Sequence, residues 1–168
     1  MSVDFGEEHL LFNQEAGAVA ALAAAAGGAA SLVTEQPQIA DYLYPTSGTF
    51  NYRVIAGTNR LSPHAYGIAI DLKSDPHGYW LWASPAEGET FIKTYPQDLV
   101  RLFEKHGFIW GGKWNHFDLF HFEYRPEIII KATCFSQGID LSKPWYQGAN
   151  MSSESIGDKI ALIDKSLG

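Results

Sequence analysis

Residues 60–71 read RLSPHAYGIAID, and this stretch decides how the fold is interpreted. From Gly67 onward, small or polar residues alternate with large apolar ones, which is the period-two pattern of a strand with one face in a core. Asp71 then lies on the face opposite the isoleucines, and His64 lies on the turn that leads into the strand. We therefore expect the side chains of His64 and Asp71 to converge on one point.

A second cluster of polar residues follows about fifty positions later, in the stretch HFDLFHFE at residues 116–123. Two histidines and a carboxylate that leave one coordination position open are what a catalytic zinc ion needs. The expected ligands are His64 and Asp71 from the first stretch and His121 from the second. Taken singly, each has a more ordinary interpretation, as a turn histidine, a strand-end cap or a histidine satisfied in the core. The prediction therefore rests on their combination.

A metal-bound water also requires a separate carboxylate that accepts its proton and passes it to the leaving amine. Asp118 is the candidate, three residues before His121. We expect residues 120–124 to form a strand, and positions i and i+3 of an unbroken strand face opposite ways. Asp118 must therefore lie on a turn just before that strand. The main rival metal ligand is His116, two residues before Asp118.

Composition and charge limit the classes of function. With 168 residues, 46% of them hydrophobic, the chain can bury its own core, and we expect one domain over residues 1–168. A net charge of -7 without a cluster of Lys or Arg argues against a nucleic-acid surface. The lone cysteine, Cys134, excludes an intrachain disulfide and a cysteine-type zinc site. No stretch is expected to span a membrane.

The N-terminal region is rich in alanine between residues 16 and 30, but acidic residues rather than Lys or Arg precede this run. A secretory signal peptide begins with positive charge, so we expect none in this chain. We interpret the region as a helix that packs on the domain and whose regular part ends at Gly27 and Gly28. The candidate core positions are Leu10, Leu11, Val19, Leu22 and Leu32.

Three further segments carry local signals. Residues 49–56 are rich in β-forming residues and predict a strand that runs toward the first cluster. Residues 74–89 contain Pro and Gly and predict a long loop, whose aromatic residues either wall a substrate groove or pack in the interior. Thr94 and Gln97 suggest a capping box for a helix that ends at Gly107. The aromatic residues of the loop are Tyr79, Trp80 and Trp82.

The motifs SPHAYGIAID at residues 62–71 and DLFHFE at residues 118–123 resemble those of the M15 zinc peptidases. This family includes D-alanyl-D-alanine carboxypeptidases, the vancomycin-resistance D,D-peptidases and phage L-alanyl-D-glutamate endolysins. The resemblance covers about half of the chain, with a motif-bearing core at about residues 49–130. It implies an α+β chain with the Hedgehog/D,D-peptidase fold, a small antiparallel sheet flanked by helices. It also implies that the three expected ligands bind Zn2+.

The resemblance implies roles for other residues as well. Asp118 stands at the position of the general base, which is Glu in the carboxypeptidases and dipeptidases and Asp in some endolysins, so it favours the endolysin branch slightly. The family holds the substrate or the developing oxyanion with an upstream arginine, and a planar guanidinium suits both. Arg53 and Arg60 are the candidates, and we prefer Arg53 because it lies in the expected strand. Ser62 either hydrogen-bonds the substrate or shapes the turn. Glu123 is either an acceptor that orients the metal-bound histidine or an exposed strand residue.

The leading hypothesis is a zinc-dependent metallopeptidase that hydrolyses a bond in the peptidoglycan stem peptide, either as a D-Ala-D-Ala carboxypeptidase or as an L-Ala-D-Glu endopeptidase. The alternative is a non-catalytic zinc-containing binding or signalling module on the same fold, which has no need for the carboxylate of Asp118. A serine hydrolase built on Ser62, His64 and Asp71 is disfavoured, because Ser62 and His64 lie too close in sequence and no Gly-x-Ser-x-Gly motif occurs. Peptidoglycan as the partner implies a periplasmic or extracellular protein at the cell wall.

Overall fold

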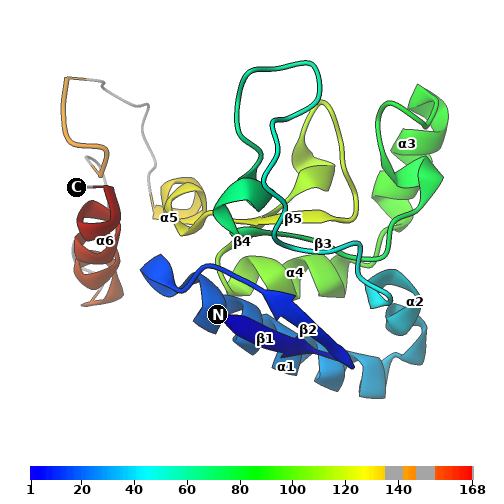
Figure 1. Ribbon diagram of the computed structural model, residues 1–168, viewed down its shortest axis with the longest axis horizontal. Coiled ribbons are helices and arrows are strands. Elements are labelled where there is room, and N and C mark those ends of the chain that lie inside the picture. The colour runs from blue at the N-terminus through cyan, green and yellow to red at the C-terminus, as the bar shows by residue number, and fades with distance from the viewer. Residues whose placement is uncertain (135–141, 147–153, 168) are drawn as a thin grey trace.

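The computed structural model describes residues 1–134, 142–146 and 154–167, and within them helices combine with two small antiparallel sheets (Figure 1). The larger sheet has the strand order β3-β5-β4, and the smaller one pairs β1 with β2. This mixture is compatible with the predicted α+β class. The strands are β1 (Ser2–Phe5), β2 (Glu8–Leu11), β3 (Ala69–Asp71), β4 (Phe108–Trp110) and β5 (His121–Tyr124). The helices are α1 (Ala18–Glu35), α2 (Ala40–Leu43), α3 (Pro85–Thr94), α4 (Gln97–Lys105), α5 (Pro126–Cys134) and α6 (Glu154–Leu167).

The three-stranded sheet brings the two predicted clusters side by side. Its strands β3 and β5 confirm the strands predicted in these two stretches, although β3 is shorter than its pattern. They pair antiparallel so that Asp71 lies opposite His121. The neighbouring pair, Ile70 and Phe122, is fully buried. Because successive side chains of a strand face opposite sides, the ionisable pair and the apolar pair lie on different faces of the sheet.

Helix α4 packs against the apolar side of this sheet (Figure 1). Its Leu99, Val100 and Phe103 are buried, and the Phe103 ring lies 4.5 Å from the ring of Phe122 in β5. The helix predicted here is confirmed, and Gly107 follows it in the left-handed conformation, with φ at 87°. The core beneath the sheet therefore combines aromatic rings with aliphatic side chains.

The segment predicted as a long loop contains the start of helix α3. Ser84 and Glu87 form a capping box that begins this helix, and the sequence interpretation missed it. The capping box predicted for the next helix is wrong, because Thr94 is the last residue of α3. Pro96 precedes α4 instead, and no side chain caps the N-terminus of α4.

The first eleven residues form a hairpin of β1 and β2, which corrects the interpretation of this region as a helix. Val3, Phe5 and Leu10 are buried, whereas Leu11, a predicted core position, is 58% exposed. Gly6 lies in the turn with φ at 63°, a conformation that glycine adopts without strain. The alternation of apolar and polar residues in β1 is the period-two signal that the helix interpretation overlooked.

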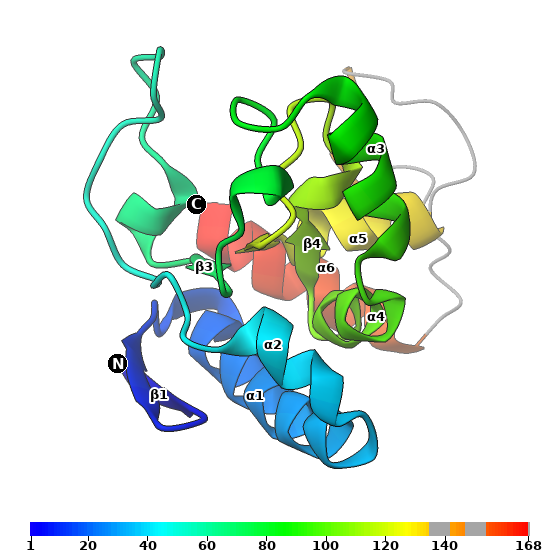
Figure 2. The same ribbon diagram turned by 90° about the vertical axis from the view of Figure 1, so that its right-hand side faces the viewer.

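Helix α1 runs beside β1 and α2 (Figure 2) and continues through Gly27 and Gly28 to Glu35, so the prediction that these glycines end it is wrong. A Cβ on Gly28 would collide with the side chain of Leu102 in α4. Glycine at this position therefore lets α1 and α4 approach closely, at a cost in helix propensity of about 1 kcal/mol.

By length and composition, the helix at Glu15–Glu35 is long and apolar enough to cross a membrane. This finding corrects the expectation that no stretch of the chain reaches that length and apolarity. Core helices of soluble proteins and signal sequences pass the same test, so one such helix is a weak indication of a span. Leu22 is buried as predicted, and Val19 and Leu32 are partly buried against the core. The buried positions of α1 are Ala18, Leu22, Ala25 and Ala29.

Residues 49–56 do not form the predicted strand. A single bridge joins Val54 to Leu61, and Phe50 and Tyr52 are exposed. A β-forming sequence needs a neighbouring strand and a surface to pack on. This segment pairs only locally, through residues 53–55 with residues 60–62, and most of its side chains are exposed. It forms instead the first half of an arm, residues 49–61, that extends from the sheet (Figure 1).

Candidate metal centre and its cleft

The three predicted ligands meet at the end of the three-stranded sheet. Asp71 Oδ1 lies 2.7 Å from His121 Nδ1, and Asp71 Oδ2 lies 3.2 Å from His64 Nε2. The two imidazoles also approach each other, with 3.2 Å between His64 Nε2 and His121 Nδ1. One ligand atom from each residue lies within 4.8 Å of the others. The three side chains could therefore hold a metal ion.

A short 3-10 helix over Pro63–Tyr66 positions His64. The hydroxyl of Ser62 accepts a hydrogen bond from the backbone N–H of His64 at 3.3 Å and so begins this helix. Gly67 ends it in the left-handed conformation, with φ at 65°. Ser62 and His64 are both buried. Of the two roles considered for Ser62, the hydrogen bond matches the shaping of the turn.

In each imidazole, the ring nitrogen that does not face Asp71 lies beside a hydrogen-bond acceptor. His64 Nδ1 lies 2.5 Å from the carbonyl oxygen of Thr49, and His121 Nε2 lies 3.2 Å from Glu123 Oε1. With the N–H of each neutral ring directed at these acceptors, the lone pairs of His64 Nε2 and His121 Nδ1 face the side of Asp71. Metal-binding histidines are usually held in this way. Glu123 is buried and is no exposed strand residue. The Thr49 acceptor was missed because any residue type supplies the same carbonyl.

Charge compensation within the cluster shifts the pKa values of two ligands. Burial alone would raise the pKa of Asp71, but the hydrogen bonds with His121 and His64 outweigh it and hold that pKa well below its usual range. Burial alone would lower the pKa of His121, but hydrogen bonds to Asp71 and Glu123 raise it to about 10. The metal-free cluster thus holds a proton. A divalent cation supplies the same positive charge, and its binding releases that proton.

Asp118 lies on a turn immediately before β5, which is the condition for its predicted place in the site. Its carbonyl accepts a hydrogen bond from His121 N–H at 3.3 Å, and its own N–H donates to the carbonyl of Gly111 at 3.1 Å. A Cβ on Gly111 would collide with the backbone of Asp118, so the turn requires glycine there. Burial raises the pKa of the Asp118 carboxyl to about 7 against the opposing charge of His121. Such a carboxyl can take up and return a proton near neutral pH.

A cleft opens over the cluster, and both candidate arginines line it. Arg53 and Arg60 are exposed residues of the arm. The reason given for preferring Arg53, its place in a strand, is therefore wrong. Its charge nevertheless acts on the carboxyl of Asp118 and favours the ionised form, which places Arg53 within electrostatic reach of the site.

Aromatic residues form part of the cleft wall. Tyr79 and Trp80 line the cleft, as one of the two interpretations of this segment predicted, whereas Trp82 is 63% exposed. His116 stacks on Trp80 with ring centroids 4.0 Å apart. This rival ligand therefore belongs to the wall and lies outside the metal-binding group.

Arg125 is a cleft residue that the sequence interpretation missed. Its guanidinium lies 3.4 Å from Glu123 Oε2 and also contacts Glu127. Glu123 therefore binds His121 with one carboxylate oxygen and Arg125 with the other. The signal that could have revealed Arg125 is its position two residues after Glu123, because alternate residues of a strand share a face.

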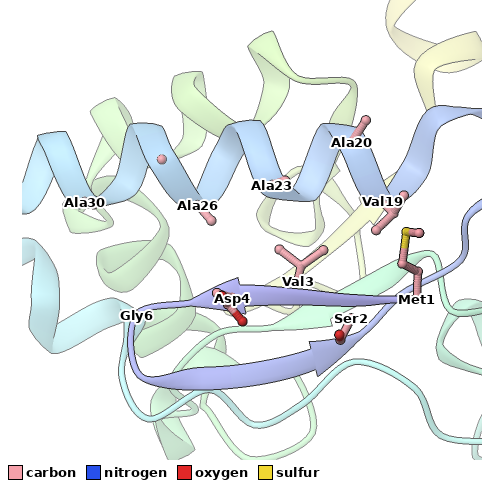
Figure 3. A pocket seen from close by; sticks show the side chains of 11 residues that line it. Met1, Ser2, Val3, Asp4, Gly6, Val19, Ala20, Ala23, Ala26 and Ala30 are labelled. Atoms are coloured by element: carbon pink, nitrogen blue, oxygen red, sulfur yellow. The ribbon is translucent and has the colours of Figure 1, made fainter.

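A second hollow lies between β1 and α1 (Figure 3). Its lining consists mainly of small or apolar residues, and Val3 of β1 points toward α1 across it (Figure 3). Of the lining residues, Asp4 has the one titratable side chain. A lone carboxylate offers neither a metal-binding set nor an acid–base pair, so we place the candidate chemistry in the cleft.

Comparison with known proteins agrees with this assignment. Residues 56–124 match the family model described as D-alanyl-D-alanine carboxypeptidase, which supports an M15 family peptidase and confirms the resemblance. The matched segment contains the three candidate ligands and Asp118. Neither the curated proteins nor the solved structures include a significant match.

Proposed function

We propose that this protein is a zinc-dependent metallopeptidase that hydrolyses a bond of the peptidoglycan stem peptide, on the Hedgehog/D,D-peptidase fold. The observation that carries the proposal is the convergence of His64, Asp71 and His121 within 4.8 Å, beside a cleft that also contains Asp118. Two histidines and one carboxylate suit zinc and leave a position for water. The family match over residues 56–124 supports peptidase chemistry at this site.

The side chains around the metal position supply the remaining parts of the reaction. Zinc at the three ligands would polarise the scissile carbonyl and lower the pKa of a bound water from about 15.7 toward roughly 7. The carboxylate of Asp118 accepts the proton of the attacking water and returns it to the leaving amine. In the metal-free protein burial raises its pKa to about 7, and the positive charge of a bound zinc would favour the ionised form that accepts the proton. The acceptors on Thr49 and Glu123 keep both imidazoles oriented meanwhile.

The cleft suits an acidic substrate. Arg53, Arg60 and Arg125 line it, and a guanidinium group binds a carboxylate or an oxyanion through a planar fork of donors. The stem peptide carries carboxylates that these side chains can bind. Asp rather than Glu at the base position favours the L-Ala-D-Glu endopeptidase over the D-Ala-D-Ala carboxypeptidase. Such a substrate would place the protein in the periplasm or outside the cell, at the cell wall.

Digestion of purified peptidoglycan, followed by mass spectrometry, tests this proposal. A freed stem peptide is the expected product, and the loss of one D-Ala would instead identify a carboxypeptidase. A protein that binds zinc but releases neither product would contradict the proposal and support the non-catalytic zinc-containing module. Metal analysis of the same sample separates this outcome from a failure to load the metal.

A further inference from the structure

Two buried polar side-chain atoms have no hydrogen-bond partner among the residues that the structure describes. They are the hydroxyl oxygen of Tyr95 and Oδ1 of Asp118. Buried polar side-chain atoms of native proteins nearly always have a partner, because an unsatisfied one loses its hydration without compensation. The occurrence of two such atoms in one part of the molecule calls for a common explanation.

The two residues belong to one packed neighbourhood. The ring of Tyr95 stacks on Trp110, with ring centroids 5.1 Å apart. The Trp110 Nε1–H donates to the carbonyl of Leu119 at 2.7 Å. The next residue, Gly111, accepts a hydrogen bond from the Asp118 N–H at 3.1 Å. Trp110 therefore contacts both Tyr95 and the segment that carries Asp118.

The two orphaned atoms are also chemically complementary. Burial raises the pKa of the Tyr95 hydroxyl, and the neighbouring acidic groups of Tyr42 and Asp118 raise it further. Tyr95 therefore keeps its O–H, which is a hydrogen-bond donor, throughout the physiological pH range. An ionised Asp118 carboxylate offers acceptors alone. A buried donor and a buried acceptor thus lie within electrostatic reach of each other.

We propose that Tyr95 is a positioning residue for Asp118 and that its hydroxyl is linked to Asp118 Oδ1 through one bound water, because neither atom has a direct partner. Oδ1 is the carboxylate oxygen that is closed off from solvent. When Oδ1 is held by a hydrogen bond from this bound water, Oδ2 of Asp118 faces the cleft and takes the proton of the attacking water. The inference rests on the proposed base role of Asp118, and its effect on rate comes from orientation of the carboxylate.

A purely structural Tyr95 would act through its ring alone. The ring packs on Trp110 and against Tyr42, whose ring centroid lies 5.4 Å away, and phenylalanine would keep both contacts. Tyr95→Phe therefore separates the role of the hydroxyl from that of the ring. Tyr42→Phe is the matched control, because it removes a hydroxyl from the neighbouring ring, which is 36% exposed.

Steady-state kinetics on a synthetic stem peptide test the proposal in the zinc-loaded protein. Tyr95→Phe is expected to lower kcat about tenfold, with KM, zinc content and thermal midpoint close to those of the wild type. Tyr42→Phe is expected to keep the wild-type kcat. An unchanged kcat in Tyr95→Phe would overturn the proposal. A loss of zinc or of folded protein that accounts for the whole decrease would overturn it too.

A second measurement needs neither catalysis nor the Tyr95→Phe variant. Carbon-13 at the Cζ of tyrosine reports on the hydrogen bond of the hydroxyl, and the Tyr95 signal is recognised by its proximity to Trp110. Asp118→Ala is expected to shift this signal, and an unshifted signal would overturn the proposal. If the wild type cleaves no stem peptide, the proposed function fails. This measurement still decides whether the Tyr95 hydroxyl is hydrogen-bonded to the Asp118 carboxylate through the water.

Discussion

The cleft over β3 and β5 and the hollow between β1 and α1 are two depressions of the same molecule with different construction. Arginine, histidine, tryptophan and carboxylate side chains from several separate segments line the cleft. One hairpin and one helix face, composed mainly of alanine, glycine and other small or apolar residues, line the hollow. The hollow results from the shape of two elements, whereas the cleft joins residues far apart in sequence.

The difference shows what a depression needs before it can carry chemistry. Buried ionisable groups are costly unless neighbouring groups compensate them. Beside the cleft, the carbonyl of Thr49 and the carboxylate of Glu123 hold the two imidazoles, and Asp71 contacts both imidazoles. No comparable set occurs among the residues that line the hollow. Substitutions in the cleft should therefore affect metal binding and hydrolysis, and substitutions in the hollow should affect neither.

The largest effect is expected for Asp118→Ala. Removal of a general base lowers the rate of hydrolysis by about 10²–10⁴-fold, while zinc content stays at the wild-type level because Asp118 lies outside the ligand group. Product release measured by mass spectrometry, with metal analysis of the same preparation, checks both parts. Wild-type activity in a purified variant would remove Asp118 from the base role.

The stability of the metal-free protein should depend on pH through the same residue. The folded pKa of Asp118, about 7, lies above its ordinary value of 3.8, so the folded state binds the proton more tightly. The stabilisation that Asp118 gives to the folded state is fully present below about pH 4 and is lost as the pH rises to about 7. Asp118→Asn cannot ionise and should gain on the order of a few kcal/mol relative to the wild type over this interval. Urea unfolding of both proteins at several pH values measures it, and parallel stability curves would contradict it.

A smaller effect on metal affinity is expected for Glu123→Leu. The variant removes the acceptor that orients His121, and loss of such a partner weakens metal binding by about 10–100-fold. Glu127→Gln is the matched control, because Glu127 contacts Arg125 beside the cleft and lies outside the ligand group. Competition with a zinc-binding dye compares the affinities. Equal affinities in both variants would show that Glu123 does not support the metal site.

The smallest effect is expected in the hollow. Ala23 is exposed and lines it, so Ala23→Ser should change the free energy of unfolding by no more than about 0.5 kcal/mol. The rate of hydrolysis should equal that of the wild type. Denaturant unfolding and the peptidoglycan assay check the two expectations. A marked loss of activity would mean that the hollow takes part in the function and that the contrast with the cleft is wrong.

Local spacing within each of two stretches predicted the elements that carry the candidate metal ligands, and the combination of the stretches predicted that the ligands meet. The alternation after Gly67 predicted the strand that carries Asp71, and the turn before it placed His64 at the same end. The requirement that Asp118 precede the strand of His121 also followed from strand geometry. These features depend on residues within a few positions of one another, and such patterns are visible without knowledge of the tertiary structure.

Features that depend on distant partners were not found. Residues 49–56 have strand-like composition, but in the structure they form an exposed arm. Strand β4 was not predicted, because its formation depends on pairing with β5. Gly28 was interpreted as a break in the first helix, although it instead leaves space for Leu102 of another helix. The stacking of Tyr95 on Trp110 likewise depends on a partner that is distant in sequence.

The most direct test of the central claim, that His64, Asp71 and His121 form a zinc site, is calorimetric titration of zinc into the metal-free protein. The account predicts one site per chain in the wild type and none in His121→Ala. Because the pKa of His121 is raised to about 10, binding should also release a proton, and the measured heat should vary with the ionisation enthalpy of the buffer. Absence of binding to the wild type, or equal binding by the variant, would contradict the account.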